Sequence, residues 1–237
     1  MGAVQAFRRG GWGNRGWALP LRGIRRCALA ARRALKSPLK LTNMALVVPE
    51  DFGLAMASVE RDAILALADG DRKVTPILAG FLELQTALAS GQYDGWHFSG
   101  HGIHRTPDPN KASILLGKGQ QFTPDNLAGE IRRLGRTRPF VFLNACQTGR
   151  GGLSLTGVVG WAREFLTSGA GALVGTYWSV FDQPACHFAS ALYAHLLSGE
   201  PIGKAVQCAR AAIRTAGDPT WLAYAVFAHP MARLETT

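Results

Sequence analysis

Two residue types that together perform acyl transfer, a thiol and an imidazole, occupy comparable points of this 237-residue chain. His101 follows the apolar run YDGWHFS and stands between two glycines, and Cys146 follows the apolar run PFVFLNA. A thiol with an ordinary pKa of about 8.5 is mostly un-ionised at neutral pH. A neighbouring imidazolium lowers that pKa and supplies the proton for a leaving amine. Cys146 as nucleophile and His101 as its base would therefore suffice for acyl transfer.

Acyl transfer also needs hydrogen-bond donors for the oxyanion of the tetrahedral intermediate. Because glycine lets the backbone approach a substrate closely, we expect the N–H groups of Gly102 and of Cys146 itself to form this oxyanion hole. Each motif is weak when it is taken alone. A single cysteine after a buried strand is more often a packing residue, and glycines mark any tight turn. Their occurrence together after two strands is what favours a site.

The elements that must position this pair alternate between strands and helices. Strand patterns are expected at 41–48, 72–76, 93–99, 139–145, 172–177 and 221–228, and a hairpin at 114–116 and 121–122. Helical patterns are expected at 54–69, 81–90, 158–167, 184–197 and 203–215, with another helix starting at 123–125. This alternation predicts an α/β fold with a mainly parallel sheet. Such sheets bind ligands beyond the carboxyl ends of their strands, where His101 and Cys146 both stand.

The composition predicts one globular domain preceded by a basic tail. Apolar residues make up 47% of the chain and charged residues 18%, and no apolar run approaches the ~20 residues of a membrane-spanning helix. The net charge of +10 belongs to residues 1–43, which hold ten Lys or Arg and no acid. Since the remainder is neutral, the domain itself shows no sign of binding nucleic acid. We place the tail at 1–40, the domain at 41–232 and a C-terminal tail at 233–237.

Three interpretations of the basic tail stay open. The first residues are rich in Gly, Arg and Trp, and an amphipathic basic helix is predicted from Leu21 to Leu39. This segment could be an organelle-targeting peptide, a helix that contacts an anionic membrane surface or a partner protein, or a linker without a further role. A nucleic-acid-binding arm is a weaker fourth interpretation.

The four cysteines are widely spaced, without a CxxC pair or a Cys/His cluster at metal-ligand spacing. The sequence therefore predicts neither a metal site nor a cofactor. No apolar signal-peptide core follows Met1, which favours a reducing, cytoplasmic setting with free thiols. Cys186 and Cys208 fall in predicted helices and are interpreted as packing residues, and His97 within a strand as a structural histidine. His104 is the one rival to His101 as base.

The segments YDGWHFSGHG, FVFLNACQTG, GALVGTYWSVFDQPA and LLSGEPIGKAV resemble the CHAT domain family, caspase-related cysteine peptidases of clan CD. The resemblance covers residues 41–229. Asn144 stands where caspases proper have Gln, and Thr148 separates Gln147 from Gly149, so the match is to the CHAT branch. It implies a caspase-like three-layer α/β/α sandwich with Cys146 as nucleophile and His101 as general base and acid. The group that orients His101 stays undetermined.

Two residues after the strand at 172–177 are candidates for substrate binding. In related clan CD peptidases an acidic residue near the position of Asp182 receives a basic P1 side chain, so the resemblance implies cleavage after Arg or Lys. The alternative is that Asp182 is the N-cap of the helix at 184–197. Trp178 would wall the P1 pocket or serve ordinary packing. Asp94 is expected to orient backbone near the site.

The resemblance thus predicts an endopeptidase acting on protein or peptide substrates, linked to bacterial defence or programmed cell death and activated by a partner protein. Two alternatives stay open, a non-catalytic caspase-like interaction module and a Cys–His amidase for a small substrate. The intact pair argues against the first alternative, and an acidic pocket lined by Asp182 argues against the second.

Overall fold

A computed structural model describes residues 38–49, 56–103, 112–127, 134–145 and 158–235. By internal contacts the chain separates into residues 1–34 and a compact unit of residues 35–237. The predicted basic tail therefore lies almost entirely outside the described residues, as do Cys146 and His104.

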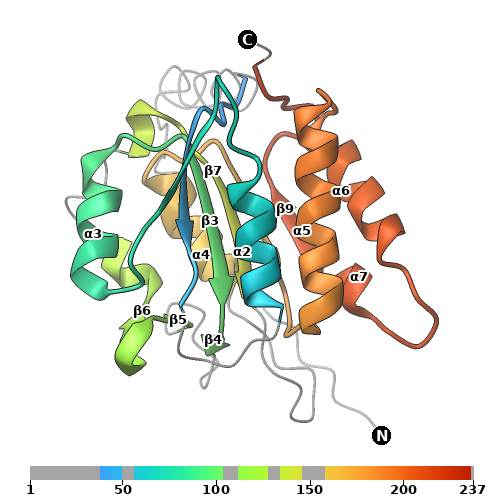
Figure 1. Ribbon diagram of the computed structural model, residues 1–237, viewed down its shortest axis with the longest axis horizontal. Coiled ribbons are helices and arrows are strands. Elements are labelled where there is room, and N and C mark those ends of the chain that lie inside the picture. The colour runs from blue at the N-terminus through green and yellow to red at the C-terminus, as the bar shows by residue number, and fades with distance from the viewer. Residues whose placement is uncertain (1–37, 50–55, 104–111, 128–133, 146–157, 236–237) are drawn as a thin grey trace, which may run out of the picture. The chain divides into compact units, whose positions relative to one another are not determined.

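A six-stranded sheet forms the centre of this unit, with strand order β2-β1-β3-β7-β8-β9 (Figure 1). Its first five strands are mutually parallel and β9 is antiparallel, which confirms the predicted mainly parallel sheet. The strands are β1 (Asn43–Val47), β2 (Lys73–Pro76), β3 (Gly95–Gly100), β7 (Phe140–Ala145), β8 (Ala172–Thr176) and β9 (Tyr224–Phe227).

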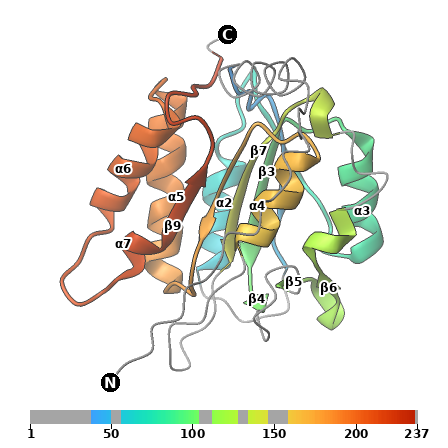
Figure 2. The same ribbon diagram turned by 180° about the vertical axis from the view of Figure 1, so that it is seen from behind.

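Helices cover both faces of the sheet, as the two views in Figures 1 and 2 show. The helices on one face are α2 (Ala57–Leu65), α5 (Asp182–Leu197), α6 (Ile202–Ala212) and α7 (Thr220–Ala223). The other face packs against α3 (Phe81–Ser90) and α4 (Val158–Thr167). The three layers explain why the strand sequences are almost continuously apolar: both faces of each central strand are buried.

A second, three-stranded sheet follows β3 directly. It consists of β4 (Gly102–Ile103), β5 (Ser113–Leu115) and β6 (Gln121–Phe122), and η2 (Gly117–Gly119) connects the last two. The hairpin predicted from the sequence is confirmed, since Ile114 pairs with Phe122 in an antiparallel register. Strand β4 was not predicted from the sequence, because two residues are too few to show a strand pattern. The chain then enters a short 3₁₀ helix, η3 (Pro124–Leu127), with proline at its first position as predicted.

The last predicted strand begins later than its pattern suggested. Residues 220–223 form the helical turn α7, and only Tyr224–Phe227 form β9. The Asp218 carboxylate accepts a hydrogen bond from the Thr220 N–H at 2.8 Å, a side-chain contact that starts a helical turn after Pro219. Trp221 and its neighbours are apolar on a helical turn here, so their apolarity was misassigned to the strand.

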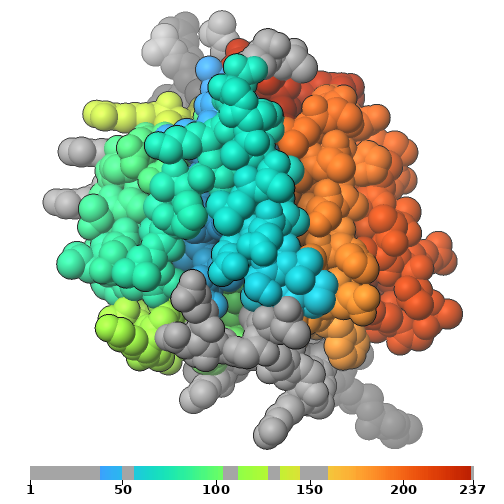
Figure 3. All heavy atoms as spheres, viewed as in Figure 1, coloured from blue at the N-terminus to red at the C-terminus, as the bar shows by residue number. Residues whose placement is uncertain are grey.

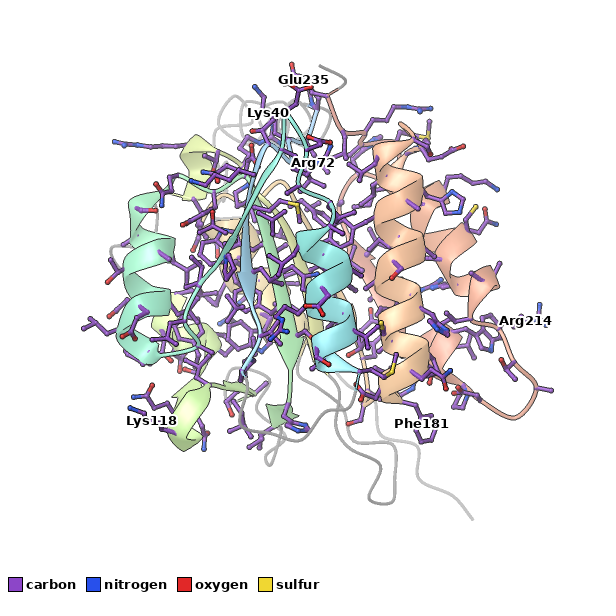
Figure 4. All side chains as sticks on the ribbon, viewed as in Figure 1. Lys40, Arg72, Lys118, Phe181, Arg214 and Glu235 are labelled. Atoms are coloured by element: carbon purple, nitrogen blue, oxygen red, sulfur yellow. The ribbon has the colours of Figure 1, made fainter. Side chains whose placement is uncertain are left out.

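Both ends of the described unit meet at the amino edge of the sheet. Leu39 is buried and pairs with Leu234, and its neighbour Lys40 forms an ion pair with Glu235 at 3.0 Å. Figure 4 shows Lys40 and Glu235 beyond the amino ends of the strands, and Lys118 and Phe181 beyond the carboxyl ends. Within the described residues, no helix is long and apolar enough to cross a membrane.

Candidate active site

Strands β3 and β7 are direct neighbours, and their register fixes where the two predicted catalytic residues leave the sheet. The pairing runs in parallel and ends with Gly100 opposite Ala145. His101 and Cys146 are the next residues of the two strands. The structure therefore places Gly100 and Ala145, the residues before the two predicted catalytic residues, side by side at the carboxyl edge of the sheet. Cys146 itself lies outside the described residues.

The chain around His101 is held by the small sheet rather than left as an open loop. The carbonyl of His101 accepts a hydrogen bond from the Leu115 N–H at 2.9 Å, and Gly102 pairs with Ile114 across β4 and β5. His101 and Gly102 are both half-buried. Gly100 lies against the end of β1, where a Cβ would come within 3.3 Å of the Pro49 ring. The glycine before His101 thus lets the β3 backbone lie close to the Pro49 ring.

Asp182 lies at the same edge of the sheet and connects two helix starts. It is the first residue of α5, whose N-cap is Phe181 and has no side-chain capping bond, so the predicted N-cap role of Asp182 is wrong. Its Oδ2 instead accepts a hydrogen bond from the N–H of Met56, the N-cap of α2, at 2.9 Å. A carboxylate between two helix N-termini is electrostatically favourable, because both present positive partial charge.

Trp178 follows β8 at this edge and is half-buried. Its ring packs against the core between the sheet and α5, which is the packing role that the sequence left open. The indole N–H is buried, and no described residue accepts a hydrogen bond from it.

A buried polar network beneath this edge was not foreseen from the sequence. Glu60 of α2 is only 2% exposed, and its carboxylate joins the two central strands. It bonds to His97 of β3 at 3.0 Å, accepts the hydroxyl of Ser99 at 2.9 Å and accepts the side-chain amide of Asn144 of β7 at 2.6 Å. Sequence periodicity gave Glu60 no weight, since one acid on a helix is ordinarily a solvated residue.

Two tyrosines complete the network from the other side of the layer. The Tyr224 hydroxyl donates to Asn144 Oδ1 at 2.9 Å, and the Tyr193 hydroxyl lies 3.1 Å from His97 Nδ1. Burial, reinforced by the charge of Glu60, raises the pKa of Tyr193 well above its ordinary value, so its hydroxyl stays protonated. His97 is confirmed as a fully buried structural histidine.

Electrostatics on this face also separate Cys186 from any catalytic role. Its thiol is 3% exposed, and burial together with the nearby charges of Glu60 and Asp182 raises its pKa to about 11. A thiol that stays protonated is a poor nucleophile. The predicted packing role of Cys186 is therefore confirmed.

Asp94 does not orient backbone near the site, contrary to expectation. It precedes β3 and so lies at the amino edge of the sheet, the edge opposite to His101. Its carboxylate accepts the Asn43 N–H at 2.8 Å and the Thr42 hydroxyl, which fixes the start of β1. The sequence correctly placed Asp94 at the start of a strand. The candidate site, however, lies at the carboxyl end of that strand.

Two further features bear on chemistry at this edge. A cavity of about 510 Å³ opens beside the carboxyl ends of β1 and β2 and includes Val48, Ile77 and Lys118 in its lining. Within the described residues, no group of three or more His, Cys, Asp or Glu side chains could hold a metal ion.

Comparison with known proteins gives one family and one fold. The family model of the CHAT domain matches residues 18–231, which includes most of the predicted basic tail. No curated protein sequence matches the chain.

Two kinds of solved structure share the fold. One is the Arg-specific cysteine proteinase gingipain R, with a TM-score of 0.55 at 14% identity over 85% of this chain. Another is separase of Saccharomyces cerevisiae in its complex with securin, with a TM-score of 0.55 at 14% identity over 88% of this chain. The chain spans 50% of the gingipain chain and 14% of the separase chain. These likenesses establish the caspase-like three-layer fold.

Proposed function

Because the chain belongs to the CHAT domain family and has the fold of caspase-like cysteine peptidases, we propose that it is a cysteine endopeptidase with Cys146 as nucleophile and His101 as general base and acid. The observation that carries this proposal is the pairing of Gly100 with Ala145, the residues directly before the pair. Neighbouring strands lie about 4.8 Å apart, a separation that two side chains can close with a hydrogen bond. The proton would pass from the Cys146 thiol to His101 and then to the leaving amine.

The oxyanion hole of this proposal consists of the N–H groups of Gly102 and Cys146. In support, β4 and β5 hold the backbone around Gly102, and preorganised donors stabilise an oxyanion far better than mobile ones.

We further propose that Asp182 receives a basic P1 side chain, with Trp178 beside it. Asp182 is half-buried at the carboxyl edge, and a carboxylate has about four acceptor positions, of which the Met56 N–H uses one. It can therefore bind a guanidinium while it stays fixed to α2. The likeness to an Arg-specific proteinase agrees with this preference.

The natural substrate is proposed to be a protein cleaved in a defence or cell-death response, after a partner protein activates the enzyme. The family supports the setting, and the fold is shared with a separase that is bound to securin. The basic tail at 1–40 is proposed to contact a partner or a membrane surface.

The decisive experiment compares wild type with Cys146→Ala and His101→Ala on fluorogenic peptides that differ only at P1. Turnover of Arg or Lys peptides that both substitutions abolish is the expected result. Turnover that survives in Cys146→Ala would exclude the proposed nucleophile. Turnover of small amides but no peptide would favour the amidase alternative.

Asp182→Asn tests P1 recognition separately. It keeps an oxygen for the Met56 N–H and removes the charge, so kcat/KM for an Arg peptide should fall about 100-fold, because losing one partner of a desolvated charge pair costs about 2–5 kcal/mol. Asp218→Asn is the matched control, since Asp218 also accepts one backbone N–H but stands before α7. Equal kcat/KM values in the two variants would refute the role of Asp182.

A further inference from the structure

The buried carboxylate of Glu60 has no role in the proposed reaction, although it bonds to both central strands. Side chains along a strand alternate between its faces, so His97 and Ser99 share one face of β3, and His101 follows two residues after Ser99. On β7 the same two-residue step leads from Asn144 to Cys146. Ser99 and Asn144 are register partners, and both donate to Glu60. Glu60 thus joins the positions one step below the proposed catalytic pair.

The geometry of these bonds makes the link rigid. One oxygen, Oε2, accepts from Ser99, and the other, Oε1, accepts from Asn144 and contacts His97, so a single carboxylate holds both strands. Hydrogen bonds to an ionised carboxylate are shorter and about twice as strong as neutral ones. The partners are themselves fixed, because Asn144 accepts the Tyr224 hydroxyl and donates to the Ala185 carbonyl. Asn144 is thereby held by bonds to three different segments of the chain.

Stability alone does not account for a charge at this position. Glu60 is buried in the contact of α2 with the sheet and α5, and the cyan surface of α2 adjoins the orange surface of α5 in Figure 3. Well-packed apolar residues commonly replace buried charged groups without loss of stability. A charge that ties together two strand ends is explained when the spacing of those ends matters. Catalysis has that requirement, since a displacement of about 1 Å can lower a rate about 100-fold.

We propose that Glu60 is a positioning residue, which sets the spacing of His101 and Cys146 through Ser99 and Asn144. This inference rests on the proposed Cys–His function. Glu60 is assigned no step of the reaction itself in this scheme. It acts on their strands, one residue pair below them.

The test is Glu60→Gln, with Asp94→Asn as matched control. Both substitutions turn a buried carboxylate that binds the sheet into its amide, but Asp94 lies at the opposite edge. Glu60→Gln should lower kcat for the Arg peptide about 10- to 100-fold and leave KM within about twofold, since positioning acts on the reacting geometry. Asp94→Asn should keep kcat within about twofold at a comparable loss of thermal stability. Equal kcat values in the two variants would overturn the proposal.

Ser99→Ala keeps the proposal testable if Glu60→Gln does not fold. It removes one donor from the carboxylate and leaves the packing of β3 in place, so kcat should fall about threefold to tenfold. A kcat equal to that of wild type in Ser99→Ala would count against the proposal.

A second readout separates this inference from the proposed function. The rate at which iodoacetamide alkylates Cys146 at pH 7, followed by mass spectrometry, reports how far His101 ionises the thiol. If wild type and His101→Ala react equally fast, the dyad itself is wrong and the inference falls with it. If wild type reacts faster and Glu60→Gln matches it, the dyad stands and the role of Glu60 is refuted. The expected result is a Glu60→Gln rate close to that of His101→Ala.

Discussion

The two faces of β3 carry chemically different side chains. Alternate residues of this six-residue strand point to opposite faces. Trp96 and Phe98 point into an apolar core cluster shared with α3 and α4. His97 and Ser99 point the opposite way, toward the Glu60 carboxylate of α2. Both faces are equally shielded from water. Burial alone therefore does not decide the composition of a layer.

The physical reason for the difference is the kind of contact that each layer makes with the sheet. Apolar contacts on the α4 side are non-directional, so they do not depend on the alignment of one donor with one acceptor. Hydrogen bonds to Glu60 are directional and lock Ser99 against Asn144. The polar face therefore adds register control directly beneath the proposed catalytic edge.

The largest expected effect comes from the apolar face. Phe165 of α4 is fully buried, with its ring 6.2 Å from that of Phe98 and 6.0 Å from that of Trp161. Phe165→Ala should lower the free energy of unfolding by about 3–5 kcal/mol, measured by urea denaturation, because it leaves a cavity. The folded fraction should keep the kcat of wild type. A fall in kcat as large as that of Glu60→Gln would mean that the apolar face also positions the catalytic residues, contrary to this prediction.

A smaller effect is expected from single hydroxyls on the polar face. Tyr224→Phe leaves the Oδ1 of Asn144 without its donor, and Tyr193→Phe removes the hydroxyl that lies 3.1 Å from Nδ1 of His97. Each should lower the free energy of unfolding by about 1–3 kcal/mol in urea denaturation, the cost of an unsatisfied buried polar group.

Tyr93→Phe is the control for the hydroxyl prediction, because Tyr93 packs on the apolar side against Trp96. Within the described part of the chain no hydrogen bond of its hydroxyl is found, so the change should stay within about 0.5 kcal/mol. Equal losses for all three tyrosines would remove the distinction between the faces.

The last effect is absent at neutral pH, appears only at alkaline pH and again belongs to the polar face. Burial and the charges of Glu60 and Asp182 raise the pKa of Cys186 from 9.0 to about 11, and the pKa of Tyr193 is raised above 10. Both groups are neutral when protonated, so the folded state keeps protons that the unfolded chain releases. Stability should therefore fall as pH rises from about 9 to about 11.

Urea midpoints measured between pH 8 and pH 11 check this expectation. Cys186→Ala should flatten the part of the decline that begins near pH 9, and the Tyr193 part above pH 10 should remain. Midpoints that stay constant to pH 11 in wild type would contradict the raised pKa values.

The sequence by itself determined the order of the elements and the edge at which the site lies. Apolar runs with intervening helical periods predicted β3 and β7, and because parallel strands finish on one side, their carboxyl ends, directly before His101 and Cys146, lie at one edge of the sheet. The bounds of α3 and α4 were predicted to the residue. Boundaries failed where a side chain intervened, as Asp218 does before α7.

Only the tertiary structure decided which polar residues work together. Glu60, Ser99 and Asn144 come from three separate segments, and no local spacing relates them. Nor could a sequence tell that Asp182 binds the start of α2 rather than capping its own helix. Periodicity reports which face of an element is buried, whereas a hydrogen bond between distant segments depends on distances that arise only once the layers have packed.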